Sequence, residues 1–420
     1  MQKLTWRQLA AVGSMLFGLF FGAGNLIFPV AMGQLAGRNL WAAAAGFLIT
    51  GVGLPLLGVA ALGLSRESGL LALSSRVGRG YGLAFTCALY LTIGSFFAIP
   101  RCATVSYTVG IAPLAPGGGA ALGVFSLAFF AVVLFFSLRP GQILTWVGKV
   151  LNPLFLAFLA VLVLRALAAP LGQAAAVEPA GAYRAAPFAT GLLEGYNTMD
   201  ALAGLAFGIL VVQAIRRLGV RAPGDVAVST VCAGVFSSAL MAGIYLLVTL
   251  VGAQSRGRFA AAANGGEALA QIAAAYFGRA GALILAATVT VACLKTAVGL
   301  ITSCGETFVE IFPHGPSYRV WAVGFCLLSF LIANLGLDAI LAWSQPVLMA
   351  LYPLAIVLIL LTLAGPLYGD DRAVLRGGLG CTAAAAVLEF LRALPAGAAP
   401  AVQPVVDWAA WLPLYAKGFG

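Results

Sequence analysis

The chain has 420 residues, of which 62% are hydrophobic and only 9% are charged. Soluble domains carry about 25% charged residues, so this composition excludes a water-soluble globular protein. It also leaves no room for a separate soluble domain. The net charge is +10, but the basic residues stand singly between apolar runs, which argues against the clustered basic face of a nucleic-acid-binding protein. Because a bilayer core needs about 20 apolar residues per helix, we predict an all-α integral membrane protein.

Apolar stretches bounded by glycine, proline and basic loops predict about twelve transmembrane helices. The first follows Lys3 and Arg7 like a secretory signal, but it is too long for one and is expected to remain as a span. The last is short and contains Asp407. The predicted spans are residues 8–35, 39–64, 80–111, 121–138, 142–168, 188–214, 224–252, 280–311, 318–334, 337–364, 375–394 and 403–416.

The loops between these spans indicate an orientation. If the N-terminus is inside, the inner loops hold roughly twice as many lysines and arginines as the outer loops, as cytoplasmic loops do. Both termini are therefore predicted to be cytoplasmic. Residues 1–420 are expected to form a single transport domain.

Two of the predicted spans contain glycine and polar residues at mid-membrane. They are the run Gly22–Pro29 in the first span and Gly195–Gly204 in the sixth. Glycine costs about 1 kcal/mol relative to alanine inside a helix, and proline costs more, so both spans are expected to unwind locally. Unwound backbone is tolerated in a membrane only where it lines a protein-enclosed cavity. The alternative for either run is close packing of helices through small residues.

The positions of these two breaks favour a repeat. Each lies in the first span of a possible five-span unit, which is typical of transporters with inverted repeats and a central binding site. We therefore predict a five-plus-five arrangement in which spans one and six are broken. Repeat one would cover about residues 8–168, repeat two about 188–364, and two extra helices about 375–416.

Ionisable residues inside spans are costly and point to function. They are Arg101, Asp200, Lys295, Glu306 and Asp338. Arg101 is expected to form an ion pair within the bundle and not to contact substrate, and Asp338 is expected at an interface. Lys295 and Glu306 are expected to compensate charge, with Lys295 paired to Asp200 or to Glu306. The alternative for Lys295 is that its ammonium reaches toward the membrane surface.

The eighth span carries a second polar pattern. Gly299, Thr302 and Ser303 share one helical face with Lys295 and Glu306. The two hydroxyls and the Gly299 carbonyl are hard oxygen donors. If these oxygens lie opposite the free backbone carbonyls of the first break, the two sets together would form a site for a small cation. The alternative is that the hydroxyls bond back to carbonyls of their own helix.

Cysteine and histidine give no sign of catalysis. The seven cysteines lie in or beside apolar segments without a paired metal-binding spacing, and the single histidine, His314, lies in a proline-flanked loop. We interpret the cysteines as small core residues. No hydrolytic triad or metalloenzyme site is indicated, and neither enzymatic activity nor a cofactor is expected.

Five motifs, in order along the chain, resemble the bacterial branched-chain amino acid:cation symporters, the BrnQ-type carriers. The resemblance covers nearly the whole chain and implies membership of the amino acid, polyamine and organocation superfamily, with a leucine-transporter-like fold. The motifs are Gly22–Pro29, Pro100–Ser106, Gly195–Asp200, Thr296–Leu300 and Asn334–Leu337.

The resemblance also implies a function and a site. It predicts uptake of leucine, isoleucine and valine with Na⁺ or H⁺ as the coupling ion, across the bacterial cytoplasmic membrane, with no oligomeric state indicated. An amino acid or amine exchanger of the same superfamily is the alternative. A channel is disfavoured because the chain has no filter-like carbonyl run. The amino acid is expected at Ala23, Gly24, Asn25, Tyr196, Asn197, Thr198 and Asp200, its side chain near Phe97, Phe207 and Leu300, and the cation (Na⁺ if sodium-coupled) at Gly22, Asn25, Gly299, Thr302 and Ser303.

Overall fold

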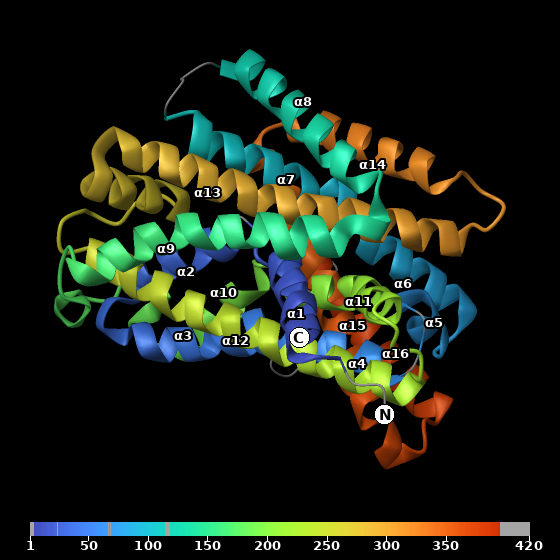
Figure 1. The fold of residues 1–420 in the computed structure, drawn as a ribbon. Coiled ribbons are helices and arrows are strands. Elements are labelled where there is room, and N and C mark those ends of the chain that lie inside the picture. Colours follow the sequence, from blue (N-terminus) through green and yellow to red (C-terminus); the bar gives the residue numbers. More distant parts are fainter. Residues whose placement is uncertain (1–3, 23, 66, 68, 114–117, 395–420) are drawn as a thin grey trace.

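The computed structural model describes residues 4–22, 24–65, 67, 69–113 and 118–394. Within these ranges the chain is helical, without a strand (Figure 1), so the predicted all-α class is confirmed. By length and composition, eight helices can cross a membrane, or nine when one bent pair is counted as a span. Twelve spans and the five-plus-five repeat stay predictions, and the predicted span 403–416 lies outside the described residues.

Nine α-helices precede the loop that leads to the sixth predicted span. Wider π-helical turns occupy residues 49–53, 92–96, 106–111 and 144–151, so several spans are continuous but irregular. The helices are α1 (Trp6–Phe20), α2 (Gly24–Ala36), α3 (Leu40–Leu48), α4 (Leu54–Ser65), α5 (Leu70–Ser75), α6 (Arg79–Leu91), α7 (Ala98–Val105), α8 (Gly118–Ser137) and α9 (Asn152–Ala168).

Seven more α-helices complete the described chain. Short 3-10 turns at residues 37–39, 140–142, 174–176 and 181–183 lie between helices. The later helices are α10 (Pro187–Tyr196), α11 (Asp200–Arg217), α12 (Pro223–Ser255), α13 (Gly265–Ile311), α14 (Tyr318–Ala333), α15 (Leu337–Tyr368) and α16 (Arg372–Arg392).

The two predicted breaks are present. In the first span α1 ends at Phe20 and α2 begins at Gly24. In the sixth, α10 ends at Tyr196 and α11 begins at Asp200, with a bend of 43° between them. The backbone is therefore interrupted where the glycine-rich runs predicted it.

Two features of the backbone differ from the prediction. The third span is also interrupted, because Gly94 has non-helical angles (φ −88°, ψ −123°) just before α7. The region from 253 to 279 was predicted as a loop, yet α13 begins at Gly265, where the Asn264 side chain caps the helix. The helix changes direction at Gly278 (φ 57°) and then continues as the predicted eighth span.

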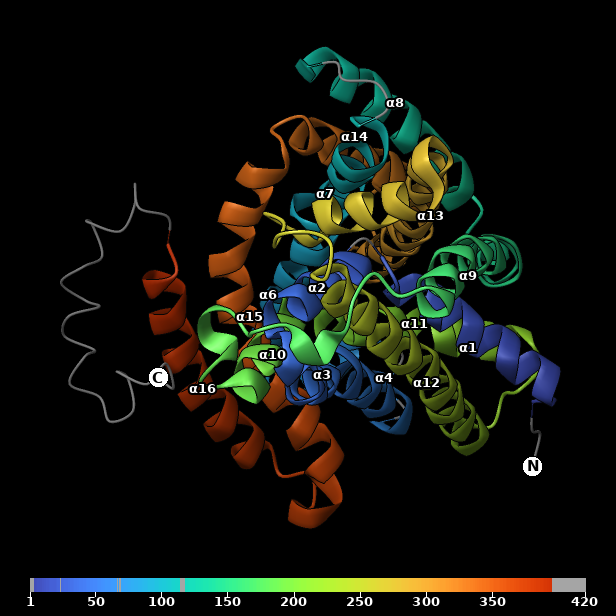
Figure 2. The ribbon, with the colours of Figure 1, turned by 90° about the vertical axis from the view of Figure 1, so that its left-hand side faces the viewer.

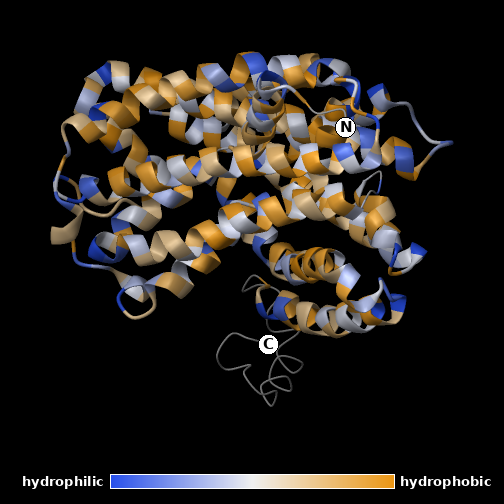
Figure 3. Ribbon diagram, turned by 60° about the horizontal axis from the view of Figure 1, so that its bottom comes forward, coloured by the Kyte–Doolittle hydropathy of each residue, from blue (hydrophilic) through white to orange (hydrophobic). Residues whose placement is uncertain are grey.

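The helices form a bundle around α11. Nearly every residue of α11 up to Ile215 is buried, whereas α8 exposes apolar side chains such as Val124 and Leu127. Helices α15 and α16 lie together at one edge (Figure 2). Hydrophobic residues run along the helices and hydrophilic ones gather toward their ends and connecting loops (Figure 3). This distribution is what a bilayer requires of a multi-pass membrane protein.

Glycine allows α2 and α12 to pack with their backbones nearly touching. A Cβ atom at Gly252 of α12 would collide with the carbonyl oxygen of Val30, and one at Gly33 would collide with that of Thr249. A backbone atom cannot move aside as the end of a side chain can, so neither position has room for a methyl group.

We expect Gly252→Ala to destabilise the protein by about 1 to 3 kcal/mol, because α2 and α12 must separate to admit the methyl group. Gly243→Ala, in the same helix, is the matched control, since a Cβ there meets nothing within 4 Å. The stability of the control variant should rise by up to about 1 kcal/mol, because alanine has a higher helix propensity than glycine. Thermal unfolding in detergent compares the two variants, and equal midpoints would show that the helices separate without cost.

Candidate substrate cavity

A cavity of about 30 Å³ lies between the two breaks. It has room for about two water molecules, so an aliphatic amino acid enters only when the surrounding helices separate. Its walls come from α1, α2, the third span, α11 and α13. The lining residues are Leu19, Phe20, Gly22, Gly24, Asn25, Ile93, Ala98, Arg101, Cys102, Thr198, Met199, Asp200, Ala203, Phe207, Thr296 and Leu300.

A buried polar network joins the two broken spans. The Asn25 amide nitrogen donates to Asp200 Oδ2 over 2.5 Å and also to the Tyr245 hydroxyl. The Tyr245 hydroxyl donates to the same Asp200 oxygen over 3.0 Å. The Gly22 N–H group donates to Asn25 Oδ1 over 3.0 Å, which orients the Asn25 amide. Asp200 is the first residue of α11, where the helix dipole stabilises a negative charge.

Arg101 brings a positive charge to the same cavity. Its guanidinium donates to the Asn197 carbonyl over 3.2 Å and lies 5.9 Å from the centre of the Phe28 ring. A Cβ at Gly24 would lie 3.4 Å from an Arg101 nitrogen, so the guanidinium is next to the beginning of α2. Among the described residues, the ion pairs within 4 Å do not include Arg101. The predicted ion pair is wrong, and Arg101 instead faces the cavity.

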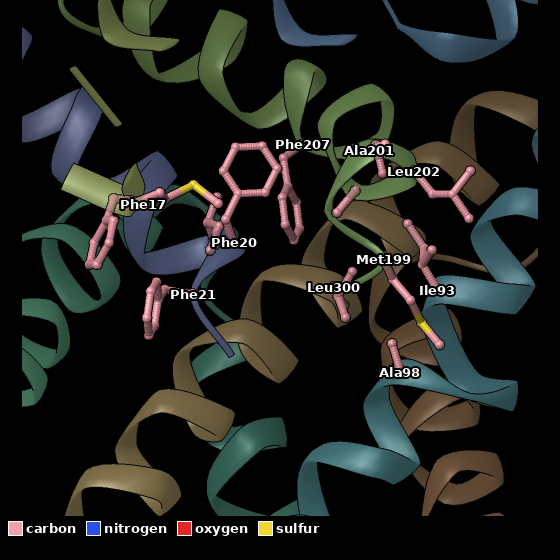
Figure 4. Close-up of a cluster of buried hydrophobic side chains, with 14 of the residues drawn as sticks. Phe17, Phe20, Phe21, Ile93, Ala98, Met199, Ala201, Leu202, Phe207 and Leu300 are labelled. Carbon is pink, nitrogen blue, oxygen red and sulfur yellow. The ribbon is translucent and has the colours of Figure 1, made fainter. Parts of the chain in front are cut away.

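The sixth-span break is held in place by partners from other helices. The Tyr352 hydroxyl donates to the Tyr196 carbonyl over 2.6 Å, and the two rings lie 4.7 Å apart. Met199, between the half-helices, has the left-handed angle φ 65°, which is rare for a residue with a side chain. Its side chain reaches Ile93 and Ala98 (Figure 4), which also line the cavity.

The structure brings most of the predicted substrate residues to the cavity. Gly24, Asn25, Thr198, Asp200, Phe207 and Leu300 line it; Ala23 lies outside the described residues. Tyr196 and Asn197 do not line it, because their carbonyls accept bonds from Tyr352 and Arg101.

The aliphatic wall was predicted only in part. Phe207 lies beside Phe20, with ring centroids 5.6 Å apart (Figure 4). Phe97 turns away from the cavity toward Phe96. Its neighbours Ile93 and Ala98 take the position that was predicted for it, because the backbone is interrupted at Gly94.

Of the predicted cation residues, Gly22 and Asn25 lie at the first break, while the hydroxyls of Thr302 and Ser303 bond to helix carbonyls. Gly22 faces Thr296, and the Thr296 hydroxyl is buried without a hydrogen-bond partner among the described residues. Gly299 packs against Leu19. Thr302 donates to the Val298 carbonyl over 2.8 Å, and Ser303 donates to the Ala206 carbonyl over 2.8 Å.

The charge-compensating roles need correction. Lys295 is fully buried and donates to Asn152 Oδ1 over 3.2 Å. Its ammonium lies 4.0 Å from the centre of the Phe155 ring, 5.0 Å from that of Phe17 and 5.7 Å from that of Phe21. The predicted pairing with Asp200 or Glu306 is therefore wrong. Aromatic faces stabilise the cation in its place, while Glu306 lines a different cavity.

Sequence reasoning missed several residues of this site, and four of them differ in the signal that the sequence offered. Tyr245 and Tyr352 are single tyrosines within spans, and no pattern pairs them with the breaks. Thr296 lies one turn before Gly299 on the same face of the helix, which was an available signal. Met199 gave no signal, because a left-handed angle at methionine cannot be read from composition.

Similar architectures occur in solved transporter structures. A manganese transporter from Eremococcus coleocola (mutant form) aligns with TM-score 0.63 at 15% identity, covering 97% of this chain and 94% of that one. MhsT in complex with L-phenylalanine aligns with TM-score 0.57 at 16% identity, covering 94% and 100%. MHP1, a nucleobase-cation-symport-1 family transporter, aligns with TM-score 0.56 at 14% identity, covering 92% and 93%. Together with the broken helices and the cavity between them, these structures show that the chain has a fold of the leucine-transporter type.

Sequence comparison then gives the family. Residues 6–420 match the family described as branched-chain amino acid transport protein, and the chain belongs to it. The branched-chain amino acid permease BrnQ of Lactobacillus delbrueckii subsp. lactis is 54% identical, covering 100% of this chain and 94% of the relative. The branched-chain amino acid transport system 2 carrier protein of Pseudomonas aeruginosa is 45% identical, covering 86% and 82%. The chain is a transport protein with a small-molecule substrate, not an enzyme.

Proposed function

We propose that this protein imports leucine, isoleucine and valine by symport with Na⁺ or H⁺, through alternating access. The observation that carries the proposal is one cavity with a carboxylate, a guanidinium and an apolar wall. Asp200 and Arg101 line the cavity without forming an ion pair with each other. A zwitterionic ligand with an aliphatic side chain is complementary to these groups.

The geometry supports a role for each end of the ligand. The Arg101 guanidinium and the N-terminal end of α2 at Gly24 lie together, and both attract a carboxylate. The Asp200 carboxylate also lines the cavity and would hold the ammonium. Phe20, Phe207, Ile93 and Leu300 would contact the side chain. Since one methylene is worth only about 1 to 3 kcal/mol in such a pocket, the affinities for leucine, isoleucine and valine should overlap.

Coupling follows from the broken first span. A cation bound at Gly22 and Asn25 would lie beside the groups that hold the amino acid, so each ligand would strengthen binding of the other. We propose that residues 1–420 act as one transport domain in the bacterial cytoplasmic membrane, with both termini in the cytoplasm. Helices of the first and sixth spans and their following helices would rock against the rest.

Uptake of radiolabelled leucine into proteoliposomes tests the function. Accumulation should occur with an inward Na⁺ or H⁺ gradient and be reduced by unlabelled isoleucine and valine. Counterflow that is independent of both gradients would contradict symport and favour an exchanger. Absence of leucine uptake under all conditions would contradict the substrate assignment.

If Na⁺ is the coupling ion, Thr302→Ala should raise the Na⁺ concentration for half-maximal leucine binding roughly tenfold, the loss of about one oxygen ligand. Thr288→Ala is the matched control, because Thr288 makes the same kind of bond to its own helix, to the Ile284 carbonyl over 2.6 Å. Equilibrium binding across a Na⁺ series measures both variants. An unchanged Na⁺ dependence in Thr302→Ala would leave that hydroxyl with only its bond to Val298.

A further inference from the structure

A second, larger cavity lies at the far end of α11 and α13. Its volume is about 530 Å³, within the range of roughly 300 to 1,000 Å³ that is typical of small-molecule sites. It is lined by Pro140, Gln213, Arg216, Arg217, Glu306 and Val309, together with the ring of Tyr318.

The two cavities share the same two helices. On α11, Phe207 lines the substrate cavity and Gln213 the second one; on α13, Leu300 lines the first and Glu306 the second. Six residues of α-helix rise about 9 Å. The second cavity therefore lies about two helical turns beyond the substrate cavity along both helices.

The second cavity holds charged groups of both signs, and Glu306 interacts there with Gln213 and Arg217. Within the described part of the chain, one oxygen of its carboxylate, Oε2, is buried without a hydrogen-bond partner. The ion pairs between described residues do not join Glu306 to Arg216 or Arg217. A nitrogen of the Arg217 guanidinium donates to the Pro140 carbonyl over 3.3 Å, which holds the guanidinium against this wall. Lysine and arginine are enriched near the cytoplasmic ends of membrane spans, which explains two arginines at a helix end. This enrichment does not explain a carboxylate oxygen buried without a donor.

The chemistry of these groups defines a ligand. An ammonium group would supply the donors that Glu306 Oε2 lacks, and a carboxylate would meet the arginine side chains. Val309 and Tyr318 give the cavity an apolar wall. The combination repeats that of the substrate cavity: a carboxylate, a guanidinium and an apolar surface.

We propose that this cavity is a second amino acid site, which binds the zwitterion of the transported substrate on its path between the substrate cavity and water. The site rests on the proposed function for the identity of its ligand. The substrate carboxylate would bind Arg217, and its ammonium would bind Glu306.

Protection of a single cysteine from maleimide labelling tests the site. The background carries Ala at Cys87, Cys232 and Cys381, the described cysteines that are not buried, and Val309→Cys places a reporter in the cavity wall. His314→Cys is the matched control, because His314 is exposed in the loop after α13 and does not line this cavity. Leucine should slow labelling of Cys at 309 and leave labelling at 314 unchanged. Glu306→Gln and Arg217→Gln should each raise the half-protecting leucine concentration at least tenfold, with Arg217→Lys affected less.

A central-site variant separates local binding from coupled motion. Arg101→Met removes a charge from the substrate cavity only, so protection at 309 should persist in it. Protection that disappears with Arg101→Met would mean that the second cavity only follows the conformation of the first, and would overturn the proposal. Unchanged protection in both Glu306→Gln and Arg217→Gln, or none in the parent protein despite leucine uptake, would overturn it too. Absence of leucine uptake by the parent protein would instead count against the proposed function.

Discussion

Arg101→Met is expected to weaken leucine binding by about 10- to 150-fold, the equivalent of about 1.5 to 3 kcal/mol for hydrogen bonds to a charged group. Arg101 is buried, faces the cavity and lies beside the N-terminal end of α2. Methionine keeps most of the apolar stem, so the change removes mainly the charge and the donors. The effect should be large because the ligand carboxylate would remain in the cavity without its principal partner.

Two comparisons make the Arg101 prediction specific. Arg165→Met is the matched control, because Arg165 is exposed at the end of α9 and contacts the Tyr276 ring at 5.4 Å. Leucinol, which lacks the carboxylate, should bind the parent protein and Arg101→Met with similar affinity. Equilibrium binding of both ligands to purified protein provides the measurement. An equal loss of leucine and leucinol binding would show that Arg101 only shapes the sixth-span break through Asn197.

Asn152→Leu is expected to destabilise the protein by about 3 to 5 kcal/mol, because it leaves the Lys295 ammonium buried without its hydrogen-bond acceptor. Asn152 joins three segments: it accepts from Lys295 of α13 and donates to the Ser14 hydroxyl of α1 over 2.7 Å. Adding Lys295→Met to Asn152→Leu should recover most of the loss, since an apolar chain of similar length no longer needs an acceptor.

Thermal or chemical unfolding in detergent micelles measures this cycle. Asn334→Leu is the matched control, because Asn334 is exposed and bonds to the Phe330 carbonyl over 2.7 Å, with no ammonium nearby. It should change stability by less than about 1 kcal/mol. If the double variant were as unstable as Asn152→Leu alone, the cost would come from the lost bond to Ser14 and not from the buried charge.

The backbone of the site was largely predictable from the sequence. Glycine and proline act through the local conformation of their own residues, so the runs around Gly22 and Gly195 predicted where the first and sixth spans are interrupted. The interruption at Gly94 was missed, because a single glycine before Pro100 gives a weaker signal. The free-energy cost of an ionisable side chain inside the membrane also marked Arg101, Asp200 and Lys295 as residues that need an explanation.

The partners of those residues were not predictable. Asn25 contacts Asp200 and Tyr245, which lie 175 and 220 residues away along the chain. The sequence allowed Lys295 an ion pair on its own helical face, yet its ammonium lies among aromatic rings from α1 and α9. Arg101 was expected to be neutralised by another side chain, and the packing instead leaves it facing the cavity.

The sequence by itself determined that this is a helical membrane protein with broken spans, because composition and backbone preference are properties of each segment alone. The five motifs also indicated its family. Only the tertiary structure decided which charges share a cavity, which glycines allow helices to pack closely, and which polar groups remain without a partner. Those properties depend on the distances between helices, and the helices are brought together by packing along their whole length, to which each site residue contributes little.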